Sequence, residues 1–174
     1  EGPPNITRHV FSAPNVELSS QQFNREELAT LFPQDAWEIG ECKVLATEQG
    51  LILFKEFQRV EGGYLEVLPF TLVMKANAQA FNDGVEPRTV LRCSKGAKLK
   101  FDKADVDPLA GKSSLESAWL VGAVDIYRPA SSPEKDDSIE ILTSNVQFNK
   151  RQIFTIDEVQ FAFGNHRGSG RQLS

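Results

Sequence analysis

The chain has 174 residues, of which 40% are hydrophobic and 25% are charged, and its formal net charge is −5 with a pI near 5.1. A chain of this length buries one hydrophobic core, so we expect one main domain. The acidic balance excludes nucleic acid from the favoured partners, because binding to a phosphate backbone depends on Lys and Arg. No apolar run reaches the roughly 20 residues that a bilayer-spanning helix needs. We therefore expect membrane association only through a partner or through an anchor removed upstream of Glu1.

Residues 1–40 are expected to form an extended lead-in that contains one short helix. The start of this segment is rich in proline and polar residues and lacks the periodic apolar residues of a folded element. The helix is predicted over Asn24–Phe32, with Asn24 as its N-cap, Glu27 as the capping-box partner and Pro33 as its stop.

Residues 41–174 are expected to form the main β domain. Pro69 splits one apolar run into two strands, because a proline cannot donate to a β-ladder. Gly96 and Gly122 each begin a strand, which predicts a sharp kink or a close backbone approach. Trp37, which precedes the domain, is expected to be a core plug over one end of the sheet. The strands predicted in this part are Cys42–Thr47, Leu51–Gln58, Tyr64–Leu68, Phe70–Met74, Gly96–Phe101 and Gly122–Tyr127.

The sequence predicts no metal or cofactor. Cys42 and Cys93 form either a disulfide or two buried free thiols, and a zinc site is disfavoured because no CxxC motif or histidine cluster accompanies them. The segment Asp102–Ser114 holds several aspartates but lacks the regular alternate oxygens, the glycine and the closing glutamate of a calcium loop. We interpret it as a solvated acidic turn.

The last third of the chain contains an internal repeat. Residues 141–148 and 153–161 both read as an apolar pair, a threonine, a short polar step and Val-Gln-Phe. The period-two alternation of each copy places its apolar side chains on one face of a sheet. Residues 144–145 and 157–158 carry short polar side chains that favour turns. The repeat therefore predicts stacked strands that turn a corner in each rung.

A glycine-rich segment, residues 164–171, closes the repeat region. It lacks the following helix of a phosphate-binding loop. We expect a wide turn in which Gly168 and Gly170 adopt positive φ. The alternative is a surface contact with an anion through Arg167 and Arg171.

The sequence predicts no catalytic residues. Its two histidines, His9 and His166, have no serine or cysteine nucleophile in a recognisable motif near them. A pair of carboxylates that face each other in a cleft would be needed to favour a hydrolase. We therefore expect a protein that is not an enzyme.

Three segments carry a resemblance to a known family. They are GAVDIY at 122–127, ILTSNVQF at 141–148 and the stretch 153–171, which contains IFTIDEVQFAFG and GSGR. They resemble the LptA/LptC/OstA-like family of periplasmic lipopolysaccharide-transport domains. The resemblance implies an all-β fold, an antiparallel β-taco or open jelly roll over residues 41–174.

The same resemblance implies a function without bond making. The expected role is a periplasmic lipid-binding or bridging domain related to lipopolysaccharide export to the outer membrane. The implied partners are lipopolysaccharide or another glycolipid, and related β-taco domains that pair through strand edges. In such a fold an apolar seam along the inside takes in acyl chains, and in a closed sandwich the same residues form the core. The seam residues chosen by alternation are Leu99, Phe101, Val124, Ile126, Ile141, Val146, Phe148, Val159, Phe161 and Phe163.

A second hypothesis is a β-sandwich module of the cell envelope that binds carbohydrate or protein. It would be favoured by aromatic side chains that line up on an outer face of the sheet. The candidates are Tyr64, Trp119 and Tyr127.

Overall fold

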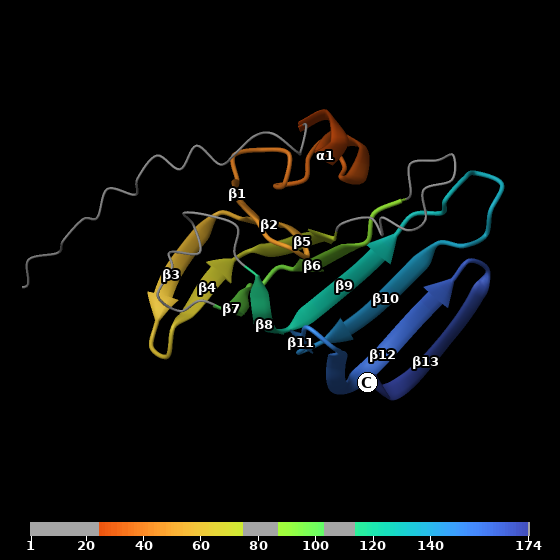
Figure 1. Cartoon of the computed structure of the whole chain (residues 1–174). Helices are drawn as coiled ribbons and strands as arrows, with labels where there is room; N and C mark the ends of the chain where they lie inside the picture. The colour runs from red at the N-terminus through yellow and green to blue at the C-terminus, as the bar shows by residue number, and fades with distance from the viewer. Residues whose placement is uncertain (1–24, 75–86, 103–113, 174) are drawn as a thin grey trace, which may run out of the picture.

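The computed structural model describes residues 25–74, 87–102 and 114–173. Within these residues the protein is built from antiparallel strands and one short helix (Figure 1). The all-β prediction is confirmed. The helix is α1 (Arg25–Leu31), and the strands are β1 (Lys43–Ala46), β2 (Gly50–Phe54), β3 (Glu56–Val60), β4 (Tyr64–Leu68), β5 (Phe70–Met74), β6 (Val90–Cys93), β7 (Ala97–Phe101), β8 (Leu115–Leu120), β9 (Ala123–Arg128), β10 (Ile139–Ser144), β11 (Gln147–Asn149), β12 (Ile153–Phe163) and β13 (His166–Leu173).

The strands form one sheet that folds over into two facing leaves. Leaf one has the order β1-β2-β5-β6-β9-β10-β12-β13, and leaf two has the order β3-β4-β7-β8-β11 followed by the start of β12. The chain repeatedly passes from one leaf to the other through a short corner, as in β2 to β3, β8 to β9 and β10 to β11. The predicted rungs that turn a corner are therefore present, and the β-taco or open jelly-roll fold class is confirmed.

Proline and glycine mark several of these corners. Pro69 separates β4 from β5, as predicted. Gly96 has φ 88° before β7 and Gly122 has φ 79° before β9, so the predicted kinks are confirmed. The prediction of one strand over Leu51–Gln58 is wrong. The run breaks at Lys55, because β2 is buried along its length whereas β3 lies at an edge of leaf two and exposes one face.

The two corner glycines provide a matched test. A Cβ at Gly96 would lie 2.3 Å from the Val67 carbonyl oxygen, whereas a Cβ at Gly122 would meet the flexible Lys95 side chain. We expect Gly122→Ala to cost about 1–2 kcal/mol of unfolding free energy, since an L side chain is strained in the left-handed region. Gly96→Ala should cost at least about 1 kcal/mol more, because a backbone carbonyl must also move. Urea denaturation measures both losses, and equal losses would show that the close approach has no energetic weight.

The threonines of the repeat hold neighbouring corners together. The Thr143 hydroxyl donates to the Glu158 carbonyl over 3.0 Å, and the Thr155 hydroxyl donates to the Ser144 carbonyl over 2.8 Å. β10 ends at Ser144, and the β12 register shifts between Thr155 and Glu158. The predicted corner at 144–145 is thus confirmed, whereas Asp157 and Glu158, predicted as a turn, lie inside β12 beside a shift in its register. Each threonine satisfies a carbonyl that the interrupted ladder leaves without its regular partner.

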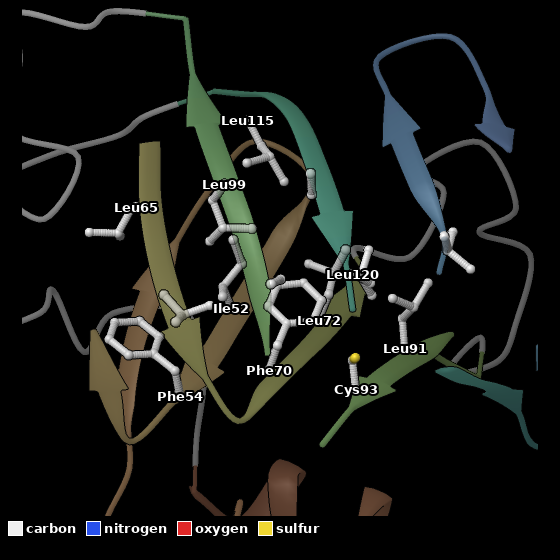
Figure 2. Close-up of a cluster of buried hydrophobic side chains, with 14 of the residues drawn as sticks. Ile52, Phe54, Leu65, Phe70, Leu72, Leu91, Cys93, Leu99, Leu115 and Leu120 are labelled. Atoms are coloured by element: carbon white, nitrogen blue, oxygen red, sulfur yellow. The ribbon is translucent and has the colours of Figure 1, made fainter. Parts of the chain in front are cut away.

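The space between the leaves holds the main hydrophobic core. Figure 2 shows side chains from both leaves meeting in one cluster, with Ile52 and Phe70 from leaf one and Leu65 and Leu99 from leaf two. These side chains are at most 2% exposed. Alternate residues of each strand point into this cluster, as the period of two predicts.

A smaller hydrophobic cluster covers the outer face of leaf one. Leu28 of α1 and Phe32, which directly follows α1, pack with Leu53 and Val73 of the sheet. The predicted short helix is confirmed, although its proposed N-cap, Asn24, lies outside the described residues. Trp37 packs in the same cluster, so its expected packing role is confirmed, although it lies on the outer face of leaf one and not over an end of the sheet. The physical reason is that the helical segment needs an apolar surface for its own buried face.

A buried ion pair fastens this segment to the sheet. The side chain of Glu38 is fully buried and accepts hydrogen bonds from Arg92 Nε at 2.8 Å, from Arg92 Nη2 at 3.1 Å and from Thr71 Oγ1 at 2.8 Å. The Arg92 guanidinium also lies 5.7 Å from the centre of the Phe32 ring. The paired charges compensate for the cost of removing them from water.

The two cysteines lie in different clusters. Cys93 belongs to the main core, Cys42 packs in the outer cluster, and both are free thiols. Burial raises the pKa of the Cys93 thiol, which donates to the Val121 carbonyl over 3.1 Å. Of the two alternatives from the sequence, the structure has the free thiols.

The glycine-rich segment differs from its prediction. The turn between β12 and β13 is only Gly164 and Asn165, whereas Gly168 and Gly170 lie inside β13 without positive φ. The expected wide turn is therefore wrong. The reason is tertiary: β13 pairs with β12, and a Cβ at Gly168 would lie 2.5 Å from the Phe161 ring, so the missing side chain makes room for that ring.

Candidate functional site

The ten seam residues chosen from the sequence lie on the inner faces of the two leaves. Leu99, Phe101, Val124, Ile126 and Val146 are buried in the main core, and Ile141 and Phe148 are half-buried against it. Val159 is buried farther along β12, followed on the same face by Phe161 and Phe163. Alternation thus identified one continuous inward surface. Most of that surface is filled by packed side chains.

One end of the inward surface is open. Phe161 is 45% exposed and Phe163 is 47% exposed, although both point to the same side as the buried Val159. In register, Phe161 pairs with Ile141 and Phe163 pairs with Ile139, and both isoleucines are half-buried. We call Ile139, Ile141, Phe161 and Phe163 the apolar trough. The strands that carry it, β10 and β12, lie in Figure 1 at the end of the molecule opposite β3 and β4.

The trough is open because leaf two is short at this end. Strand β10 has six residues, whereas β11, its continuation in leaf two, has three. Asn149 Oδ1 accepts the backbone N–H groups of Arg151 and Gln152 at 2.9 and 3.2 Å, so the chain turns back immediately after β11. No strand among the described residues therefore continues over Ile139 and Phe163.

A cationic side chain borders the trough. Arg128 pairs in register with Ile139 and so points to the same face as the trough. Its Nη2 donates to the Asp137 carbonyl over 3.0 Å, while its Nε is buried and has no hydrogen-bond partner within the described part of the chain. On the other side, His166 of β13 pairs with Phe163 and is exposed. The arrangement offers an apolar surface with basic groups at its rim.

Strand β13 forms an edge of leaf one beside the trough. It pairs with β12 alone among the described strands, so the backbone groups along its other side have no ladder partner there. Gly168, Ser169 and Gly170 give this edge little side-chain bulk, and Arg167 and Arg171 flank them on the outer face. Edges of this kind can accept a further strand.

A second group of polar side chains lies on the outer face of leaf one. Desolvation by burial and the neighbouring Glu140 carboxylate raise the pKa of Asp125, whereas Arg92 lowers it. Asp125 pairs in register with Arg92, which Glu38 holds. We therefore interpret this cluster as an extension of the structural ion pair, and assign it no reaction.

Two of the trough features were not identified from the sequence. Ile139 extends the alternation that selected Ile141, so the period of two was a sufficient signal. The position of Arg128 at the rim had no local signal, because it depends on the pairing of β9 with β10. His9 and most of the Asp102–Ser114 segment lie outside the described residues.

The described residues lack two kinds of feature. They contain no group of three or more His, Cys, Asp or Glu side chains placed to hold a metal ion. They also contain no helix that is long and apolar enough to cross a membrane. Comparisons of the chain with protein-family models, with curated proteins and with solved structures found no match.

Proposed function

We propose that this protein is a non-enzymatic lipid-binding or bridging domain of the cell envelope, with the apolar trough as its acyl-chain site. The observation that carries the proposal is the exposure of Phe161 and Phe163 on an inward face whose other seam residues are buried or half-buried. Contiguous exposed apolar side chains mark interaction sites, because water disfavours them.

The free energy gained by burying methylene groups supports an acyl chain as the ligand. Each methylene that leaves water contributes roughly 0.8 kcal/mol, so about eight methylenes buried against the trough supply about 6 kcal/mol, which corresponds to a Kd in the tens of micromolar. The bound acyl chain would extend the packed hydrophobic core outward from Val159. A negatively charged or polar head group would then lie near the rim, where the Arg128 side chain adds a positive charge beside Ile139.

The edge strand supports the bridging part of the proposal. A related β-taco domain that adds a strand to β13 would extend leaf one and lengthen the trough in the same step. Together with the resemblance of residues 122–127, 141–148 and 153–171 to the lipopolysaccharide-transport domains, this favours lipopolysaccharide or another glycolipid in a periplasmic setting as the transported molecule.

A photo-crosslinking experiment tests the site. A benzophenone amino acid is placed at Phe161 and, as a control, at Leu142, which is similarly exposed but lies on the outer face of the neighbouring strand. The two proteins are illuminated with lipopolysaccharide micelles and with phospholipid vesicles. We expect lipid adducts at Phe161 and none at Leu142. Equal labelling at the two positions, or none at either, would refute the trough as the site.

A binding measurement gives the expected magnitude. Phe161→Ser should raise the Kd for a fluorescent fatty acid by roughly 5- to 10-fold, because it removes part of the 1.5–3 kcal/mol that a buried phenylalanine contributes. Leu142→Ser should leave this Kd unchanged. Fluorescence titration of the wild type and the two variants measures the three Kd values.

A further inference from the structure

A second candidate site lies on a different leaf and a different face of the sheet from the apolar trough. The outer face of leaf two has a shallow depression of about 480 Å³, lined in part by Tyr64, Trp119 and Phe154. Trp119 is 52% exposed, Tyr64 is 37% exposed and Phe154 is half-buried. Large aromatic side chains from three different strands thus share one solvent-accessible surface.

The three rings are spaced across the sheet. Leaf two has the order β4-β7-β8-β11-β12, so Tyr64, Trp119 and Phe154 lie on every second strand. Two strand spacings amount to about 10 Å. A ligand that contacts neighbouring rings must therefore be an extended chain rather than a single small ring.

Amide side chains lie between and beside the rings. Gln147 pairs in register with Trp119 on one side and with Phe154 on the other, which places its amide between them. Gln152 lines the same depression. Each amide has donors and an acceptor, and among the described residues neither side chain makes a hydrogen bond. Both are available to a ligand that carries hydroxyl groups.

The charges of the lining do not favour an anion. Lys98 Nζ lies 3.2 Å from Glu66 Oε1, so its charge is already paired, and Glu61 adds a negative charge to the rim. A phosphate-rich or acidic ligand would find no free cation here among the described lining residues. The surface is also unlike a protein-binding core, where apolar contacts are contiguous and polar groups form the outer ring.

We propose that this depression binds a neutral glycan chain. Sugar rings have an apolar face of C–H groups and a rim of hydroxyls, so they can stack on Trp119 and Tyr64 while Gln147 and Gln152 bond their hydroxyls. The inference goes beyond lipid binding, because it concerns another leaf and another face. It gives a specific ligand class to the carbohydrate-binding alternative.

Affinity electrophoresis in native gels tests the proposal. Separate gels contain hydroxyethyl cellulose, laminarin, xylan, mannan or dextran, and retardation relative to a gel without polysaccharide measures binding. We expect the protein to be retarded in at least one gel. Trp119→Ala should weaken that binding by at least tenfold, Trp119→Phe should retain part of it, and Gln147→Ala should weaken it severalfold. Tyr127→Ala is the control, because Tyr127 is an exposed aromatic on the outer face of leaf one.

Three results would overturn the glycan site. They are no retardation in any of the five gels, equal retardation of the Trp119→Ala protein, and a Trp119-dependent dimer in sedimentation without polysaccharide, which would assign the face to a protein contact. The Phe161→Ser protein should bind polysaccharide like the wild type. This separates failure of the glycan site from failure of the lipid trough.

Discussion

Replacing Phe70 with alanine is expected to lower the free energy of unfolding by about 3–5 kcal/mol, the usual cost of removing a large aromatic from a packed core. The same replacement at Phe161 is expected to cost less than about 1 kcal/mol, as for exposed positions. Phe70 is fully buried between the leaves, whereas Phe161 is nearly half exposed and lies over Gly168 of β13. The chemical change is identical at the two positions, so the difference between the two losses of unfolding free energy reports how deeply each side chain is buried.

This comparison also shows whether the space between the two leaves is closed or is open at the apolar trough. In a closed sandwich Phe161 would be a core residue, and its loss would cost as much as the loss of Phe70. In the open form its side chain is held for a ligand and contributes little to folding. Urea denaturation followed by circular dichroism measures both values at 25 °C. A loss above about 2 kcal/mol for Phe161→Ala would remove the basis of the lipid-binding proposal.

Removing the buried carboxylate of Glu38 is the second change with a large expected effect. Glu38→Ala leaves the Arg92 guanidinium and the Thr71 hydroxyl without their acceptor. Breaking a buried ion pair from one side typically costs about 3–5 kcal/mol. We expect a value at the lower end, because the Arg92 side chain is 38% exposed and can regain water.

A conservative variant separates the contribution of the Glu38 charge to stability from the contribution of its side-chain volume. Glu38→Gln keeps the side-chain volume and one acceptor oxygen, so it should cost about 1–3 kcal/mol, typical of a weakened buried hydrogen-bond set. Thermal unfolding should show the difference directly, since each kcal/mol shifts the Tm of a domain of this size by about 2–4 °C. Equal and small Tm shifts for both variants would show that the packing of α1, and not the ion pair, fastens this segment.

Both binding proposals use features that become visible only when strands are paired. Tyr64, Trp119 and Phe154 are far apart in the sequence, and the order β4-β7-β8-β11-β12 brings them onto one face. Arg128 reaches the rim of the apolar trough in the same way, through the pairing of β9 with β10. No periodicity within one strand contains this information.

Local chemistry determined much of the fold from the sequence alone. The period of two assigned the ten seam residues to inward faces, because successive side chains of a strand must point to opposite sides. Gly96, Gly122 and the Ser144-Asn145 step marked corners, because few residues accept the backbone angles or supply the hydrogen bonds that a corner needs. These properties belong to the residues themselves.

Only the tertiary structure decided which inward residues are core and which remain open. Phe148 and Phe161 have the same place in the repeat, yet Phe148 is half-buried against the main core and Phe161 is 45% exposed. The difference arises because β11 is short and leaf two ends before it covers the trough. Which face a side chain takes is set by its own backbone, whereas its coverage depends on a second strand that is distant in the sequence.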